Sequence, residues 1–277
     1  MTEIIESYSA PVFQSGVPQN TRFSRRKAKA DGFSRCDLLI AVACVLVLGV
    51  FGLSVSGNTR DRSERAICVN NLRQIGRAYN LWASDHGDEN PFTVRISEGG
   101  LGGSRPPSVL VLPGIGQYPS NLRNMAWLQF LWIYQELQTP TVLVCPSDIL
   151  RRRASEFSND STKGFAHTNF QDSAISYFIW LHALKETPSS PLCGDRHIQY
   201  TGYNSSCYTG VGNAWDIHKD NNNNSLTSWT RAVHPDGGNL VRNDGSVAEV
   251  TSPGLRALID EIPDADNGSH HFIVPGQ

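Results

Sequence analysis

The amino-acid sequence predicts an α+β protein in which one long N-terminal helix packs on a head with a small antiparallel sheet. Three observations lead to this fold class. An uncharged apolar segment precedes an amphipathic helical stretch, a segment rich in aromatic and β-branched residues lies in mid-chain, and a hairpin pattern follows near the end. A helix, strands and a hairpin in this order are typical of α+β architecture.

The composition of the chain of 277 residues narrows the classes of function. Its 24 Lys and Arg against 26 Asp and Glu argue against a nucleic-acid binder that works through a basic surface. Charged residues make up only 18%, too few for a charge-swollen disordered protein. The six cysteines rule out a disulfide-dense mini-scaffold. We therefore expect a folded chain without a nucleic-acid partner.

The apolar segment covers residues 38–55 and contains no charge. A helix of that length rises about 27 Å, close to the hydrocarbon thickness of a bilayer. A buried core helix of this size would usually carry a polar stripe, which the segment lacks. Basic residues before a membrane helix tend to stay in the cytoplasm. These residues are Arg22, Arg25, Arg26, Lys27 and Lys29. We therefore expect a membrane helix with the C-terminal part of the chain outside the cytoplasm.

The segment 61–85 continues as an amphipathic helix. Its apolar residues recur at steps of three and four, which places them on one stripe. They are Cys68, Leu72, Ile75, Tyr79 and Trp82. Gly87 and Pro91 then stop the helix. The sequence therefore predicts a single helix from about Phe33 to Asp85, with a membrane half and a soluble half.

The head is expected to begin with a loop and a buried helix. The loop covers 99–120, which is rich in Gly and Pro. The helix pattern over 121–137 is apolar on almost every side, so we expect it between the long helix and a sheet. Pro140 ends this helix, and 141–144 reads as a short strand.

Later elements follow from residue type and turn signals. Residues 174–181 mix β-branched and aromatic types, which favours a strand. Asp244 and Gly245 predict a two-residue hairpin loop of type I′, which needs positive φ at both positions. Ser252 and Pro253 open a short final helix. Two segments are expected to be exposed insertions, 151–169 and 219–225.

The junction before the apolar segment reads Gly32-Phe33-Ser34-Arg35-Cys36-Asp37. It resembles the type IV prepilin signal of pilins and type II secretion pseudopilins. The resemblance implies that a prepilin peptidase cuts between Gly32 and Phe33 and methylates the new amino group of Phe33. It also implies an assembly role for Asp37, which stands where the family has Glu and would pair with the N-terminal amine of a neighbouring subunit.

Further segments resemble prepilin-type proteins with a C-terminal His-x9-Asp-Gly element. The matching stretches are 67–76, 145–148, 175–178 and 194–196, followed by His234, nine residues, and Asp244-Gly245. The resemblance implies a pilin-like fold. It marks Cys145, Asp148, His234, Asp244 and Gly245 as its structural motif residues, with no catalytic role.

The same resemblance implies the organisation of the chain. Residues 1–32 would be a cytoplasmic leader, 33–57 the transmembrane half of the helix, 58–86 its exported half, and 87–277 the head. The chain would be a structural subunit of a type II secretion or type IV pilus-like filament, not an enzyme. It would be a single-pass protein of the bacterial inner membrane, with its head in the periplasm or on the cell surface. Its partners would be the prepilin peptidase, other pseudopilin subunits and the inner-membrane assembly platform.

A second function fits the same membrane segment. The head of a membrane-anchored envelope protein could bind a ligand or a carbohydrate through aromatic residues in polar loops. The candidates are Tyr208, Trp215 and Trp229. Self-association in cells separates this function from a filament subunit.

The cysteines leave two readings open. Cys36 and Cys44 lie in or beside the predicted membrane segment. The other four could form the bridges Cys193–Cys207 and Cys68–Cys145, or could be buried free thiols.

Two kinds of chemistry remain as minor hypotheses. His234, Asp244 and Ser246 are the residue types of a hydrolase triad, but the turn explains Asp244 and no nucleophile elbow surrounds Ser246. Oxygen ligands for calcium occur at Asp148, Asp195, Asp244 and 216–224, although without EF-hand spacing. No zinc pattern or phosphate loop is present, so we expect no cofactor, with calcium as the alternative.

Overall fold

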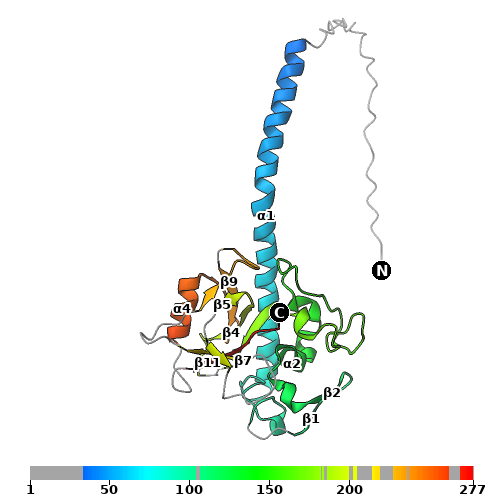
Figure 1. Cartoon of the computed structure of the whole chain (residues 1–277), viewed down its shortest axis with the longest axis vertical. Helices are drawn as coiled ribbons and strands as arrows, with labels where there is room; N and C mark the ends of the chain where they lie inside the picture. Colours follow the sequence, from blue (N-terminus) through cyan, green and yellow to red (C-terminus); the bar gives the residue numbers. More distant parts are fainter. Residues whose placement is uncertain are drawn as a thin grey trace, which may run out of the picture. The chain divides into compact units, whose positions relative to one another are not determined.

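The computed structural model describes residues 34–103, 107–181, 183, 186–199, 202–204, 214–218, 227–235, 237–261 and 269–276 (Figure 1). The chain divides into two compact units, Met1–Gly52 and Leu53–Gln277. Helix α1 (Arg35–Ser84) begins in the first unit, and the second unit contains the sheet and all other helices.

A capping box starts helix α1. The Ser34 hydroxyl oxygen accepts the backbone N–H of Cys36 at 3.1 Å, and Asp37 Oδ2 accepts the backbone N–H of Ser34 at 3.0 Å. These two bonds satisfy N–H groups that the first turn of a helix leaves without partners. The Ser-x-x-Asp spacing therefore explains why the helix begins at Arg35.

The predicted fold class, a pilin-like protein with a membrane-spanning helix half and a small sheet, is wrong in two respects. First, among the described helices none is long and apolar enough to cross a membrane. Second, the sheet has seven strands. The predicted segment boundaries at residues 32, 57 and 86 stay predictions.

The later turns of α1 belong to the second unit and bury one stripe of side chains against the rest of that unit. All five stripe residues predicted from the spacing are buried: Cys68, Leu72, Ile75, Tyr79 and Trp82. The helix lies directly on the sheet at Gly76, where an added Cβ would meet Cγ2 of Val241 at 2.6 Å. Glycine is therefore required at this crossing, because any side chain would separate helix and strand.

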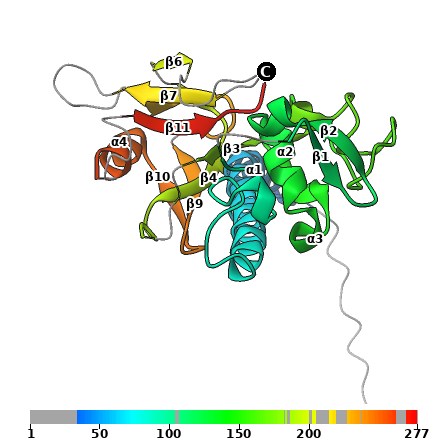
Figure 2. The same cartoon turned by 90° about the horizontal axis from the view of Figure 1, so that it is seen from below.

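The antiparallel sheet has the order β10-β9-β4-β3-β11-β7-β6. Its strands are β3 (Tyr177–Trp180), β4 (Pro191–Asp195), β6 (Gly202–Asn204), β7 (Ala214–His218), β9 (Gly238–Arg242), β10 (Val247–Val250) and β11 (Ser269–Ile273). The C-terminal strand β11 lies inside the sheet, between β3 and β7, and pairs Phe272 with Trp180 of β3. Figure 2 shows α1 between the β4–β9 side of the sheet and the region of α2 and β1.

The region 96–143 differs from its predictions in three places. 3-10 helix η1 (Ile96–Glu98) comes just before the predicted loop 99–120, and the loop itself contains a hairpin of β1 (Val109–Leu112) and β2 (Gly116–Pro119). The predicted single helix is divided into η2 (Ser120–Arg123), α2 (Ala126–Trp132) and α3 (Tyr134–Leu137). The predicted strand 141–144 is wrong, because 3-10 helix η3 (Pro140–Leu143) occupies it. Thr139 caps η3, accepting the Thr141 N–H at 3.3 Å.

The remaining elements are short. They are η4 (Gln171–Ala174), the paired strands β5 (Ile198–Gln199) and β8 (Ser228–Trp229), and α4 (Ser252–Glu261). Helix α4 begins at Ser252, as the sequence predicts, and buries Leu255 and Ile259 on one face. The predicted insertion 151–169 is not merely exposed, since Phe165 is fully buried. The predicted insertion 219–225 lies outside the described residues.

The loop between β9 and β10 is not the predicted type I′ turn. Arg242 and Ser246 close a loop of three residues, with the Arg242 N–H donating to the Ser246 oxygen at 2.8 Å. Of the three loop residues 243–245, only Gly245 has a positive φ, at 82°. This is the arrangement of a type I turn followed by a left-handed residue, in which Asp244 keeps ordinary backbone angles.

Candidate functional site

A disulfide with a histidine beside it belongs to a group of polar side chains in the second unit, which we call the polar cluster. Its members are Asp148, Arg151, Asp195, Arg196, His197, His234 and Asn239. Cys68 of α1 and Cys145, just after η3, form a disulfide, one of the two bridges considered from the sequence. His234 Nε2 lies 3.5 Å from Cys145 Sγ. Because a disulfide sulfur carries no proton, the ring nitrogen is the donor in this contact. The group connects α1, the segment after η3 and the loop before β9.

Asp195 at the end of β4 lies on the other side of His234. Its Oδ2 is 3.7 Å from His234 Nε2 and accepts the backbone N–H of Asn239 at 2.7 Å and its side-chain amide at 3.0 Å. Complete burial raises the pKa of Asp195 to about 7. Burial, and then the charge of Arg65, lowers the pKa of His234 to about 4. His234 is therefore neutral at pH 7, so this contact is not an ion pair.

His197 is held in the same neutral state. Its Nε2 donates to the Gly237 carbonyl oxygen at 3.2 Å, and its ring lies 5.7 Å from the ring of His234. Burial lowers the pKa of His197 to about 4, while the Gly237 contact opposes the shift. Two neutral imidazoles therefore lie together, and one of them, His234, lies next to a carboxyl that titrates near neutrality.

The titration of Asp195 predicts a pH dependence of stability. A carboxyl whose pKa is higher in the folded state binds more protons there than in the unfolded chain, so stability falls as pH rises from about 4 to about 7. In Asp195→Asn this loss is absent, and the amide can still accept both Asn239 hydrogen bonds. We expect the free energy of unfolding of the variant, minus that of the wild type, to increase between pH 5 and pH 8. Urea unfolding across this range measures the difference, and a constant difference would contradict the assignment.

Asp148 forms a buried ion pair that ties two segments together. Its Oδ2 and Oδ1 accept from Arg196 Nε at 2.6 Å and Nη2 at 2.8 Å. Arg151 Nε lies 3.7 Å from the same carboxylate. The two oxygens are occupied in the planar arrangement that suits a guanidinium. Asp148 therefore has a structural role, and its oxygens are not available for a calcium ion.

A pocket of about 560 Å³ opens beside His234. Its lining residues are Asp61, Arg62, Glu64, Arg65, Ser147, Val233, His234, Pro235 and Glu249. The charges in it largely satisfy one another: Arg65 pairs with Glu249, and Glu64 accepts from Arg60 at 2.8 Å and from the Ser147 hydroxyl at 3.0 Å. Ligand pockets are usually apolar with a few convergent polar groups, and this pocket lacks that character.

The structure does not assemble the predicted hydrolase triad. Asp244 and Ser246 lie in the loop between β9 and β10, where the Ser246 N–H donates to Asp244 Oδ1 at 2.8 Å. Neither residue lines the pocket that contains His234. The Ser147 hydroxyl in that pocket donates to the Glu64 carboxylate and not to His234.

The predicted calcium ligands do not converge among the described residues. Asp148 bonds Arg196, Asp195 bonds Asn239, and Asp244 lies in its surface turn. Of 216–224, positions 216–218 belong to β7, and the others are outside the described residues. Within the described ranges, the one group of metal-ligand types within reach of each other is Cys68, Cys145 and His234, and its two sulfurs are bonded to each other.

The remaining predicted site residues are in part outside the described residues and in part without the predicted partner. Gly32, Phe33 and Cys207 lie outside the described residues. Cys193 is a buried free thiol, so the structure does not contain the predicted bridge Cys193–Cys207. Burial raises the pKa of the Cys193 thiol. Asp37 is exposed at the start of α1.

Sequence reasoning missed four members of the polar cluster. They are Arg151, Arg196, His197 and Asn239. One signal was available, because the run 195–197 places three ionisable residues at the end of a buried strand. The aromatic residue Trp229, considered as a ligand contact, is instead buried beside His197.

Comparison with family models, curated proteins and solved structures finds no match to this chain. Its function is therefore inferred from its own residues and their geometry.

Proposed function

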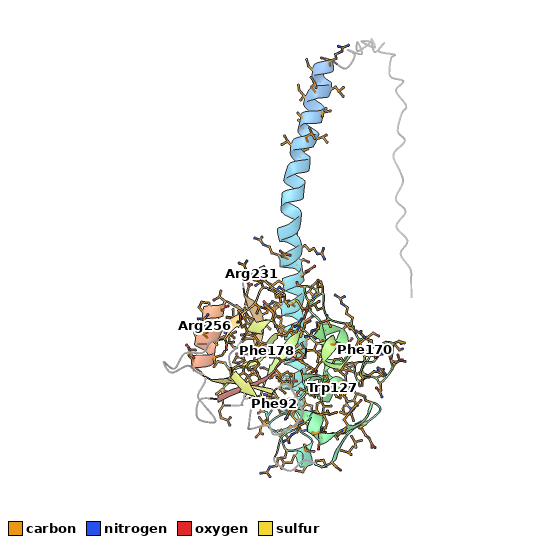
Figure 3. All side chains as sticks on the ribbon, in the orientation of Figure 1. Phe92, Trp127, Phe170, Phe178, Arg231 and Arg256 are labelled. Carbon is orange, nitrogen blue, oxygen red and sulfur yellow. A yellow bond between two sulfur atoms is a disulfide. The ribbon has the colours of Figure 1, made fainter. Side chains whose placement is uncertain are left out.

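We propose that the chain is a pseudopilin-like structural subunit of a type II secretion or type IV pilus-like filament. The observation that supports this most is the apolar surface at the start of α1. Eight large aliphatic side chains within 38–48 are between 48% and 70% exposed (Figure 3). They are Leu38, Leu39, Ile40, Val42, Val45, Leu46, Val47 and Leu48. An exposed apolar surface of this extent marks a contact with a membrane or with other proteins.

These side chains surround the helix. Successive residues of an α-helix point about 100° apart, so 38–40 and 45–48 cover every face. A helix that packs on one neighbour needs only one apolar stripe. Burying all eight side chains would contribute on the order of 10 kcal/mol. An environment of lipid and neighbouring apolar helices in the bacterial inner membrane meets this requirement, with the second unit in the periplasm or on the cell surface.

Asp37 is the residue that we assign to assembly. Its carboxylate already caps its own helix through the Ser34 N–H. A carboxylate has two oxygens and accepts several hydrogen bonds, so the same group can also accept the N-terminal amine of Phe33 in a neighbouring subunit. Charge-assisted bonds of this kind are stronger than neutral ones, especially at low dielectric. The partners proposed are the prepilin peptidase, other pseudopilin subunits and the inner-membrane assembly platform.

Processing is the first expected result. Mass spectrometry of the protein isolated from its own cells should find an N-terminus at a methylated Phe33. Gly32→Arg should prevent cleavage, because a large charged side chain replaces the glycine beside the cut bond, whereas Gly57→Ala at the far end of the apolar segment should leave cleavage unchanged. An intact residue-1 terminus, or cleavage after Ser56, would contradict the proposal.

Assembly is tested separately with Asp37→Ala. We expect this variant to be processed but to lose the ladder of self-cross-links through the N-terminal helix, because the neighbouring amine loses its counter-charge. Asp61→Ala, an exposed acid on the same helix, is the matched control and should keep the ladder. A wild-type chain that cross-links only as a monomer would instead favour an anchored envelope protein.

A further inference from the structure

A two-residue apolar tip projects from the second unit. Ile149 and Leu150 are 88% and 79% exposed, more than any other large apolar side chain among the described residues. They directly follow the segment 145–148 that carries the disulfide and the buried aspartate. Single exposed aliphatic residues are common, but two adjacent and almost fully exposed ones need a reason.

The tip is held firmly from both sides. On the N-terminal side, Cys145 is bonded to Cys68 of α1, and Asp148 is paired with Arg196. On the C-terminal side, Arg151 donates to the carbonyl oxygens of Asp172 at 3.2 Å and Gly276 at 2.7 Å. The exposure of the two aliphatic side chains is therefore part of the fold, because both flanks are buried and bonded.

The tip is followed by positive charge. Arg152 and Arg153 are exposed, and neither has a salt bridge to a described residue. The acids nearest in the sequence are paired with other residues, Asp148 with Arg196 and Glu156 with Lys163. Arg152 Nη1 donates to the Asn169 carbonyl oxygen at 3.0 Å, a bond that leaves its charge without a carboxylate partner among the described residues. Two exposed aliphatic residues beside two exposed arginines match the chemistry of an anionic lipid surface, where apolar groups enter the acyl boundary and Arg meets phosphate.

The small size of the tip favours lipid over a protein partner. A protein interface would need about 800 Å² on each partner, far more than two side chains supply.

We propose that Ile149 and Leu150, together with Arg152 and Arg153, form a contact site for anionic phospholipid. The two aliphatic side chains enter the interfacial region, and the two guanidinium groups bind headgroup phosphates. This inference rests on the proposed membrane attachment through α1. The contact would fix the second unit against the membrane surface, in addition to the attachment through the helix.

The test uses the full chain with a fluorescent NBD label at Leu150→Cys. Cys36, Cys44 and Cys207 are changed to serine so that one accessible thiol remains, and the labelled chain is incorporated into vesicles. One set contains equal parts of phosphatidylcholine and phosphatidylglycerol, and the other contains phosphatidylcholine alone. A doxyl group on the lipid acyl chain quenches NBD only when the label enters the bilayer. Val111→Cys, on the exposed side of β1, is the control position.

We expect strong quenching at position 150 in the anionic vesicles, weaker quenching in the neutral ones, and none at position 111. Adding Arg152→Gln and Arg153→Gln should shift the tip out of the bilayer about thirtyfold, since each basic residue near an anionic surface contributes about 1 kcal/mol. Equal signals at positions 150 and 111 in chains that float with the vesicles would overturn the inference and leave membrane attachment intact.

Two other outcomes are also decisive. A chain that floats only with anionic vesicles, and only with Leu150 and both arginines present, would support the lipid site while contradicting attachment through α1. Unquenched label at position 150, with self-cross-links from that position, would overturn the lipid site in favour of a contact between copies.

Discussion

Replacing Cys68 and Cys145 by serine should lower the free energy of unfolding of the protein by about 4 kcal/mol. The disulfide closes a loop with a sequence separation of 77 residues, and in the loop-entropy model a closure of this length contributes roughly that amount. The effect is large because the bond joins the long helix to a segment far along the chain. Urea unfolding followed by tryptophan fluorescence measures it, at one detergent concentration for all variants.

The matched control for the disulfide is the pair Cys36→Ser and Cys44→Ser. Both thiols are exposed and free, so the same double substitution should change the free energy of unfolding by less than about 0.5 kcal/mol. If the two double variants unfold at the same urea concentration, the disulfide does not stabilise the folded state. Intact mass with and without reductant independently reports whether the wild-type bond is present.

Asp148→Ala should destabilise the protein by about 3 to 5 kcal/mol. Removing the carboxylate leaves the buried guanidinium of Arg196 without its two-bond partner and Arg151 without its nearby acid. The charged form of Arg151 is already disfavoured in the wild type, because burial, and then the charge of Arg196, lowers its pKa to about 10. Unfolding in urea measures the loss.

The exposed ion pair Glu156–Lys163 provides the matched control for Asp148. Both side chains are 49% exposed, so Glu156→Ala should cost no more than about 1 kcal/mol. The double variant Asp148→Leu with Arg196→Met should be more stable than Asp148→Ala alone, because it removes both buried charges instead of leaving one unpaired. Equal losses for Asp148→Ala and Glu156→Ala would show that the buried pair contributes no more than an exposed one.

Local patterns predicted those elements whose formation depends on neighbours in the sequence. The stripe of Cys68 to Trp82 is buried as its spacing indicated, and the Ser252-Pro253 start of α4 is correct. The same reasoning was wrong for 141–144. Its β-branched residues suggested a strand, but Pro140 and the Thr139 cap start a 3-10 helix there.

Two strands of the sheet, β6 at its edge and β11 in its interior, left no readable pattern. β6 has three residues, and β11 begins Ser-His-His before its apolar end. Neither shows the alternation that identifies a half-buried strand. They are strands because long-range pairing satisfies their backbone groups, and β11 becomes central only after β3 and β7 flank it. The small sheet expected from the sequence was wrong for this reason.

The sequence by itself determined the local features of this protein: the buried stripe of α1, the start of α4, and Cys68–Cys145 as one of the possible bridges. Tertiary structure alone decided which of these groups meet. The pair of Asp148 with Arg196 and the cluster of Asp195 with His234 join residues between 39 and 48 positions apart. No local spacing encodes such contacts, because burial of the sheet against α1 brings these side chains together and removes the water that would otherwise solvate them.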